Sequence, residues 1–179
     1  TYGIWLALGM LLALFAASRL AARDGLKKDH IYDLALWTLI GGLVAKGHAA
    51  RDLSVIEVSP TAREKLAAQH GVRASSAPDR ATAEAQVLVL AVKPQDMRAA
   101  LAAIGGVARG KLVVSVAAGL RIDTLSRWLG GHRKIVRCMP NTPALIGAGI
   151  TGLYAPEEVQ KGEREKAETI LRAVGEVLR

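Results

Sequence analysis

The run Val87–Val92 is apolar at every position and ends at Lys93-Pro94. A strand without polar alternation is covered on both faces, as in a parallel sheet that has helices on each side. Strands that alternate with helices at this spacing predict an α/β fold with a Rossmann-like, doubly wound parallel sheet. Further short apolar runs, each a predicted strand, lie at 53–58, 112–116, 134–138 and 150–154.

Helix signals lie between these runs. Ser59 and Pro60 supply an N-cap and a first-turn proline, and Gly71 supplies a stop, so the sequence predicts a helix over 60–70. Pro94 opens a second helix, and a charged stretch from Pro156 predicts a helix that runs to the C-terminus. A third helix is predicted over 122–129.

Two prolines, Pro140 and Pro143, bracket Asn141 and Thr142 directly after an apolar strand. Proline fixes φ, and the residue before it is held extended, so this loop has a defined shape. Ligands of open α/β sheets bind at the carboxyl ends of strands. Met139, Pro140, Asn141 and Thr142 are therefore candidate binding residues.

Two other strand ends carry candidates. At 91–94, Lys93 could orient the backbone or meet phosphate or ribose oxygens, and the alternative is a solvated lysine. At 115–119, the small side chains of Ser115 and of residues 117–119 would let a flat nicotinamide ring approach the backbone, and the alternative is plain helix–sheet packing. The candidate cofactor-binding residues of these two segments are Ala91, Val92, Lys93, Pro94, Ala117, Ala118 and Gly119.

Glu57 ends the strand predicted over 53–58. An acidic side chain there can accept hydrogen bonds from an adenosine ribose. This carboxylate favours NAD, since it would repel a 2′-phosphate, but nearby Arg63 could offset it. The choice between NAD and NADP therefore stays open, and so does the alternative of a plain surface carboxylate.

The formal net charge of +8 and the pI near 10.0 could suggest a nucleic-acid partner. The basic residues are scattered, however, and no aromatic residues are interleaved with them, so the sequence predicts no nucleic-acid binding. Cys138 is the single cysteine, which excludes an internal disulfide and a cysteine metal cluster. We expect Cys138 to be a buried strand residue and predict no metal site.

The N-terminal segment differs from the rest. Residues 3–17 are uninterrupted and apolar, which is shorter than the roughly 20 residues that span a bilayer. If Arg19 reaches the interface, residues 3–22 could contact or anchor in a membrane; the alternative is a buried apolar helix. A second apolar stretch, 31–45, contains the pair Gly41-Gly42. One or two apolar helices are therefore predicted, with a membrane-type segment at 1–35 and a separate domain at 36–179.

The phrases Val89-Leu90-Ala91-Val92-Lys93-Pro94-Gln95 and Ile135–Ala144 resemble the pyrroline-5-carboxylate reductase family. The resemblance implies a Rossmann domain that binds NADP or NAD, with the 139–142 loop at the nicotinamide end. It also implies hydride transfer to the C=N carbon of pyrroline-5-carboxylate, an imino acid, to give proline, and a cytoplasmic location.

The sequence departs from that family at both ends. The family has a glycine-rich turn before the helix that corresponds to 36–46, whereas here 31–35 lacks glycine and contains Asp33. Residues 27–30 stand in place of the first strand, so we expect weak cofactor binding and a sheet that lacks this strand. The family's helical oligomerisation domain would follow Arg179, and no catalytic residue is assigned.

The first 43 residues resemble a second family, the prolipoprotein diacylglyceryl transferases, through Tyr2–Leu6 and Asp29–Trp37. That family's His-Gly-Gly signature and later arginines are absent. Three interpretations stay open: a reductase with impaired activity, a fragment of a membrane transferase, and an inactive fusion of the two.

Overall fold

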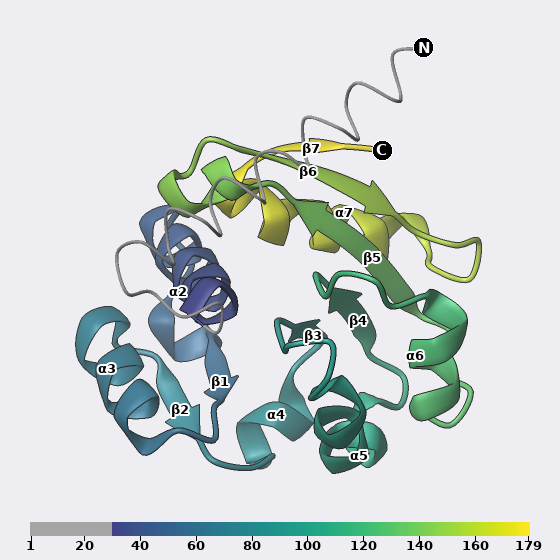
Figure 1. Cartoon of the computed structure of the whole chain (residues 1–179), viewed down its shortest axis with the longest axis horizontal. Coiled ribbons are helices and arrows are strands. Elements are labelled where there is room, and N and C mark those ends of the chain that lie inside the picture. Colours follow the sequence, from purple (N-terminus) through teal and green to yellow (C-terminus); the bar gives the residue numbers. More distant parts are fainter. Residues whose placement is uncertain (1–29) are drawn as a thin grey trace.

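The computed structural model describes residues 30–179, with side chains from residue 36 onward. The larger of two sheets has five strands in the order β3-β4-β5-β6-β7 (Figure 1). β3, β4 and β5 are parallel, β6 is antiparallel to β5, and β7 is parallel to β6. The strands are β3 (Val87–Leu90), β4 (Leu112–Ser115), β5 (Ile135–Pro140), β6 (Gly149–Tyr154) and β7 (Gly175–Leu178).

Helices cover both faces of this sheet at its parallel strands, whereas β6 and β7 each have one exposed face, and this arrangement confirms the predicted α/β architecture. α5 (Met97–Ala108) and α6 (Ile122–Trp128) enclose one apolar core, which contains Val113 of β4. α7 (Lys161–Leu171) packs on the opposite face, against a core that contains Val114. All four residues of β4 are buried, as a strand covered on both sides must be.

The smaller sheet pairs β1 (Ser54–Ile56) with β2 (Arg73–Ser75) in parallel. α3 (Pro60–His70) connects them, and its ends confirm the predicted signals. The Ser59 hydroxyl accepts from the Ala62 N–H at 3.4 Å, and Gly71 has φ +67°, a left-handed conformation that suits glycine. A short helix, α4 (Arg80–Glu84), leads to the larger sheet, and a single 3-10 turn, η1 (Ala50–Asp52), precedes β1.

Helix α2 (His30–Ala45) contacts both parts of the molecule (Figure 1). Ile40 packs with Val55 of β1 and Leu66 of α3. Leu39 and Leu43 pack with residues of η2 (Thr142–Ile146) and η3 (Arg172–Val174), and Val89 of β3 is packed against the same cluster. The helix crosses the predicted domain boundary at 35/36 without a break.

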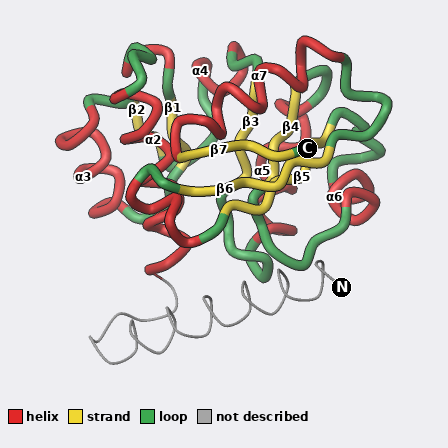
Figure 2. The backbone as a smooth tube through the Cα atoms, turned by 90° about the horizontal axis from the view of Figure 1, so that it is seen from above, coloured by secondary structure: helices red, strands yellow, loops and turns green. Residues whose placement is uncertain are grey.

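No strand among the described residues joins β1 to β3, so the two sheets stay separate (Figure 2). A doubly wound sheet of the dinucleotide-binding type has the order 3-2-1-4-5-6. The observed order β2-β1, then β3-β4-β5, matches this pattern without its strand 1. The predicted incomplete Rossmann sheet is thus confirmed for residues 30–179.

The C-terminal prediction was wrong. In place of one helix from Pro156 to the end, α7 stops at Leu171, and η3 and β7 follow. Gly175 has φ +144°, which ends the helical region, and β7 then pairs with β6. The strand β2 and helix α4 were not predicted, because three polar or small strand residues and a five-residue helix carry little periodic signal.

Several predictions concern residues 1–29, outside the described part of the chain: membrane contact through 3–22, the transferase-like phrase at 2–6, and the segment 27–29 before α2. Within residues 30–179, no helix has the length and apolarity needed to cross a bilayer.

Candidate functional site

The carboxyl ends of β3, β4 and β5 lie at one edge of the larger sheet. The three strands are parallel and in register, with Leu90 beside Ser115 and Ser115 beside Arg137. The loops that follow them are therefore neighbours. This edge brings together three of the predicted segments, 91–94, 117–119 and 139–142.

The loop after β5 is held by Asn141. Its Oδ1 accepts from the Ile150 N–H at 2.8 Å, and its own N–H donates to the Ile150 carbonyl at 3.3 Å. Thr142 then begins η2, which closes at Gly147 with φ +74°. Asn141 thus braces the loop against β6, and its Nδ2 amide is a donor that no described hydrogen bond uses.

The loop after β4 offers little surface. Ala117 is fully buried in the core under α5 and α6, and its N–H donates to the Ser115 hydroxyl at 3.4 Å. Ala118 is half-buried, and Gly119 is exposed with φ +73°. Ala118 and Gly119 are therefore the accessible residues of this loop, whereas the side chain of Ala117 packs in the core.

The loop after β3 turns directly into α5. Ala91, Val92, Lys93 and Pro94 are all half-buried, and the Lys93 carbonyl accepts from the Asp96 N–H at 3.0 Å. This hydrogen-bonded turn fixes the position of residues 91–94 at the carboxyl end of β3.

Glu57 follows β1 of the smaller sheet, which no described strand pairing joins to β3, β4 and β5. Its Oε1 accepts from the Ser59 N–H at 2.8 Å, and the second carboxylate oxygen has no described hydrogen-bond partner. Arg63 uses Nη1 to donate to the Glu57 and Val58 carbonyls, at 2.7 and 2.9 Å. The described contacts of Arg63 are thus with backbone oxygens, and not with the Glu57 carboxylate.

A cavity of about 380 Å³ beside β5, β6 and β7 was not predicted. Arg137 lines it, and its Nη1 donates to the buried Ser115 hydroxyl at 2.9 Å. Partial burial lowers the pKa of this guanidinium. The sequence feature that could have indicated this cavity is Arg137, a single charged residue within the otherwise apolar strand Ile135–Pro140. The cavity is lined by Arg137, Cys138, Met139, Gly152, Leu153, Tyr154, Leu178 and Arg179.

Cys138 is 1% exposed, as predicted. Burial raises the pKa of its thiol to about 12, so the thiol stays protonated at neutral pH. This environment does not suit a nucleophile. No cluster of metal-ligating side chains occurs between residues 36 and 179.

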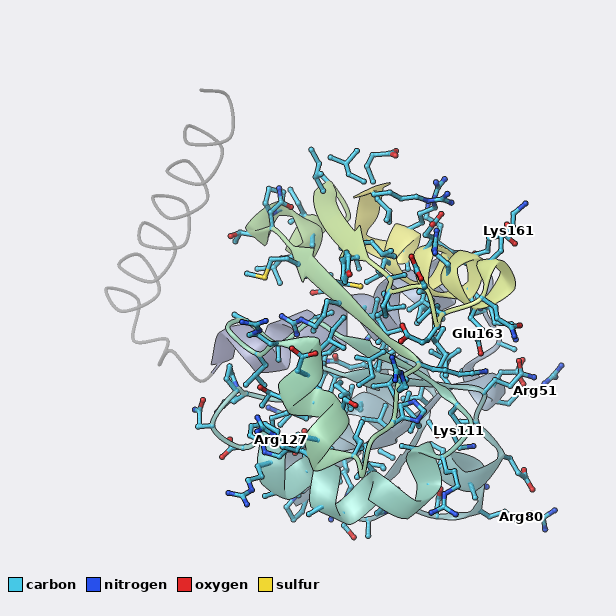
Figure 3. The ribbon with its side chains drawn as sticks, turned by 90° about the vertical axis from the view of Figure 1, so that its right-hand side faces the viewer. Arg51, Arg80, Lys111, Arg127, Lys161 and Glu163 are labelled. Atoms are coloured by element: carbon cyan, nitrogen blue, oxygen red, sulfur yellow. The ribbon has the colours of Figure 1, made fainter. Side chains whose placement is uncertain are left out.

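The basic surface is dispersed over separate elements (Figure 3). Arg80 pairs with Glu84 at 2.7 Å, and Lys111 donates to the Ala83 and Ala85 carbonyls, each at 2.5 Å. Lys134 pairs with Glu163 at 2.6 Å. Much of the positive charge therefore has a local structural use, and the absence of a nucleic-acid partner stays a prediction.

Residues 37–119 match the family described as NADP oxidoreductase, coenzyme F420-dependent. A pyrroline-5-carboxylate reductase of Pseudomonas aeruginosa is 41% identical over 139 residues, which are 77% of this chain and 51% of that protein. The Escherichia coli reductase is 36% identical over 140 residues, 77% of this chain and 52% of that protein. The chain spans about half the length of these curated relatives.

Solved structures give the same result. A pyrroline-5-carboxylate reductase from Coxiella burnetii superposes with a TM-score of 0.77 at 33% identity, covering 81% of this chain and 54% of that one. The Plasmodium falciparum enzyme, solved with NADP bound, has a TM-score of 0.68 at 24% identity, with coverages of 79% and 52%, and supports the fold. The matched part of the chain, 77% of its length, is thus similar in sequence and fold to the N-terminal NAD-binding domain of the pyrroline-5-carboxylate reductases.

Proposed function

We propose that residues 36–179 act as the cofactor-binding part of a pyrroline-5-carboxylate reductase, which reduces 1-pyrroline-5-carboxylate to L-proline. The alignment of three loops at the carboxyl edge of β3, β4 and β5 carries this proposal. The similarity to reductases over 77% of the chain supports it. A cytoplasmic location would follow from this role.

The edge fits the nicotinamide end of NADP or NAD. Ala118 and Gly119 carry almost no side-chain bulk, and the Asn141 amide can donate a hydrogen bond beside them. A reduced nicotinamide supplies the hydride when bound, and the imine nitrogen takes up a proton. The contribution of these residues is to place the ring and exclude water, and we assign no general acid to them.

Glu57 would contact the adenosine ribose through its second carboxylate oxygen. Because the described contacts of Arg63 are with carbonyl oxygens, the carboxylate has no described counter-charge there. We therefore propose a preference for NAD over NADP.

The part of the chain that would bind the pyrophosphate fits the cofactor less well than the nicotinamide end does. Residues 31–35 are already helical, within α2, where a glycine-rich turn would be needed to bring backbone N–H groups to a pyrophosphate. The match to the oxidoreductase family begins only at residue 37. We therefore propose that the chain on its own binds the cofactor weakly. No proposal rests on the transferase resemblance or on membrane contact.

Saturation-transfer NMR with NADH and NADPH on the full chain tests this proposal. We expect binding weaker than micromolar, with Kd of roughly 0.1–1 mM, and tighter binding of NADH than of NADPH. Ala118→Leu should abolish the signal of the nicotinamide protons, whereas Ala102→Leu, on the exposed side of α5, should leave it unchanged. No transfer at millimolar cofactor would refute the cofactor role, and micromolar affinity would refute the predicted weakness.

A further inference from the structure

We propose that Arg137 binds a carboxylate group in the cavity beside β5, β6 and β7. Met139, a candidate cofactor contact, lines one side of this cavity, but no role was assigned to Arg137 itself by the sequence or by the comparisons. It is built from the cation Arg137, the buried Ser115 hydroxyl that holds it, a second cation, Arg179, and a set of apolar side chains.

Arg137 has no acidic partner among the described residues. Its described hydrogen bond is to the Ser115 hydroxyl, and the ion pairs of the described chain do not include it. A guanidinium has five N–H donors, and most of them are unused here. A partly buried charge without a counter-ion is costly, so an incoming anion would gain from pairing with it.

Ser115 holds this guanidinium in place. The hydroxyl is fully buried, and Ser115 lies directly beside Arg137 in the register of β4 and β5. The bond uses Nη1, and the Nε and Nη2 edge can face an anion. That edge matches the two oxygens of a carboxylate in a planar fork.

The second cation of the cavity is already neutralised. Arg179 Nη2 donates to Glu168 Oε2 at 2.8 Å, and its Nε lies 2.6 Å from Oε1. The cavity therefore offers one uncompensated positive charge. A doubly charged phosphate would need a second positive charge, whereas a single carboxylate is neutralised by the one charge of Arg137.

The walls favour an anion that has an apolar part. Met139 is half-buried in the cavity, and Tyr154 and Leu178 are 63% and 60% exposed. Large exposed apolar side chains around a cation fit an amphiphilic carboxylate better than a fully hydrated ion. Two sources have this chemistry: a free amino or imino acid, and the acidic side chain of a polypeptide.

NMR titration of the full chain, labelled with ¹⁵N-arginine and ¹³C-methyl-methionine, tests the site. The probes are acetate, L-proline, N-acetyl-glutamate N-methylamide and inorganic phosphate, and pyrrolidine is the control without a carboxylate. We expect the carboxylates to shift the Arg137 Nε–Hε signal saturably, with Kd of roughly 1–50 mM. Pyrrolidine should not shift it, and the exposed Arg127 should not respond to any probe.

The order of the probes identifies the source. Tighter binding of L-proline indicates a free amino or imino acid, and tighter binding of the glutamate derivative indicates an acidic side chain. Binding of phosphate about tenfold tighter than any carboxylate would overturn the assignment of ligand class. Absence of an Arg137 shift with all carboxylates would overturn the site itself.

Variants at Arg137 are followed through the Met139 methyl, which lines the same cavity. Arg137→Gln should remove its response, and Arg137→Lys should weaken binding about fivefold because the fork is lost. The methyl of Met97, fully buried in the core, reports whether the variant is folded. An unchanged Met139 response in folded Arg137→Gln would refute the proposal. Cofactor binding is read separately, so this result and that of the nicotinamide titration are independent.

Discussion

The two sheets differ in how completely they are buried. Every residue of β4 in the larger sheet is buried, whereas β1 in the smaller sheet buries only Val55. The larger sheet has an extensive core on each face, and the buried core of the smaller unit is Ile40, Val55, Leu66 and Val72. Beyond β1, Val58 is 81% exposed.

This difference follows from the strand order. A strand between β1 and β3 would hydrogen-bond the two sheets into one, and the described residues supply none. The smaller unit is instead held through α2, whose Ile40 belongs to one core and whose Leu39 and Leu43 belong to another. We therefore expect the smaller unit to open separately, at a lower free energy than the larger sheet.

The largest expected effect comes from removing one leucine from each core. Leu66 and Leu125 are both fully buried, in the smaller and the larger unit. Changing either leucine to alanine should lower the free energy of unfolding by about 2–5 kcal/mol. Leu66→Ala should speed amide hydrogen exchange in β1 and α3 only, because it removes a side chain from a core that the larger sheet does not share.

Leu125→Ala is the matched variant and should lower protection throughout β3, β4 and β5. Hydrogen exchange read by NMR distinguishes the two patterns. If Leu66→Ala lowered protection in β4 as much as in β1, the molecule would unfold as a single cooperative unit, and the contrast between the sheets would be wrong.

Gly42 tests the connection between the two units. A Cβ at this position would lie 2.4 Å from the Ala173 carbonyl oxygen, which belongs to the backbone of η3. Gly42→Ala should therefore lower the free energy of unfolding by about 1–3 kcal/mol, because the added methyl group overpacks the contact with η3. The measurement is the midpoint of urea unfolding.

Gly41→Ala is the control next to it. Its Cβ would lie 3.2 Å from the His70 ring, a side chain that can shift. Alanine also has the higher helix propensity, so this variant should be neutral or more stable by up to about 1 kcal/mol. Equal destabilisation by both changes would mean that the α2–η3 contact has no special role.

The sequence predicted structure correctly where the residues that determine it are close together in the chain. The ends of α3 could be predicted because Ser59, Pro60 and Gly71 act on their own backbone. The strand β7 was missed because its pairing with β6 depends on residues more than twenty positions away, whereas the charged residues before it indicate a helix.

The site shows the same limit. The strand-end loops were found because proline and small residues mark them, and the register of β3, β4 and β5 brings them to one edge. Glu57 was expected at an adenosine ribose, and it follows β1 of the smaller sheet, so this role stays a prediction. Arg137 was overlooked because its partner Ser115 is twenty-two residues earlier in the chain, and only the strand pairing brings the two together.

The smallest expected effect concerns β7, which forms one edge of the larger sheet. Glu168 of α7 is buried and pairs with Arg179, directly after β7. The hydrogen bond from Arg179 holds the pKa of Glu168 below its usual value, against the opposing effect of burial. A carboxyl with a lowered folded pKa stabilises the fold above its unfolded pKa, near 4.5, and this contribution is lost as pH falls through the folded pKa.

Glu168→Gln should therefore lower amide protection in β7 at pH 7 by less than about tenfold, because the arginine is largely exposed. The pH dependence of β7 protection below pH 4.5 should be reduced in this variant. Glu84→Gln, which breaks an exposed pair with Arg80, is the control and should change nothing in β7. An unchanged β7 in Glu168→Gln would mean that pairing with β6 holds this strand without the ion pair. Backbone pairing alone would then stabilise every strand of the larger sheet, including β7. The difference in stability between this sheet and the two-stranded unit would be larger than proposed here.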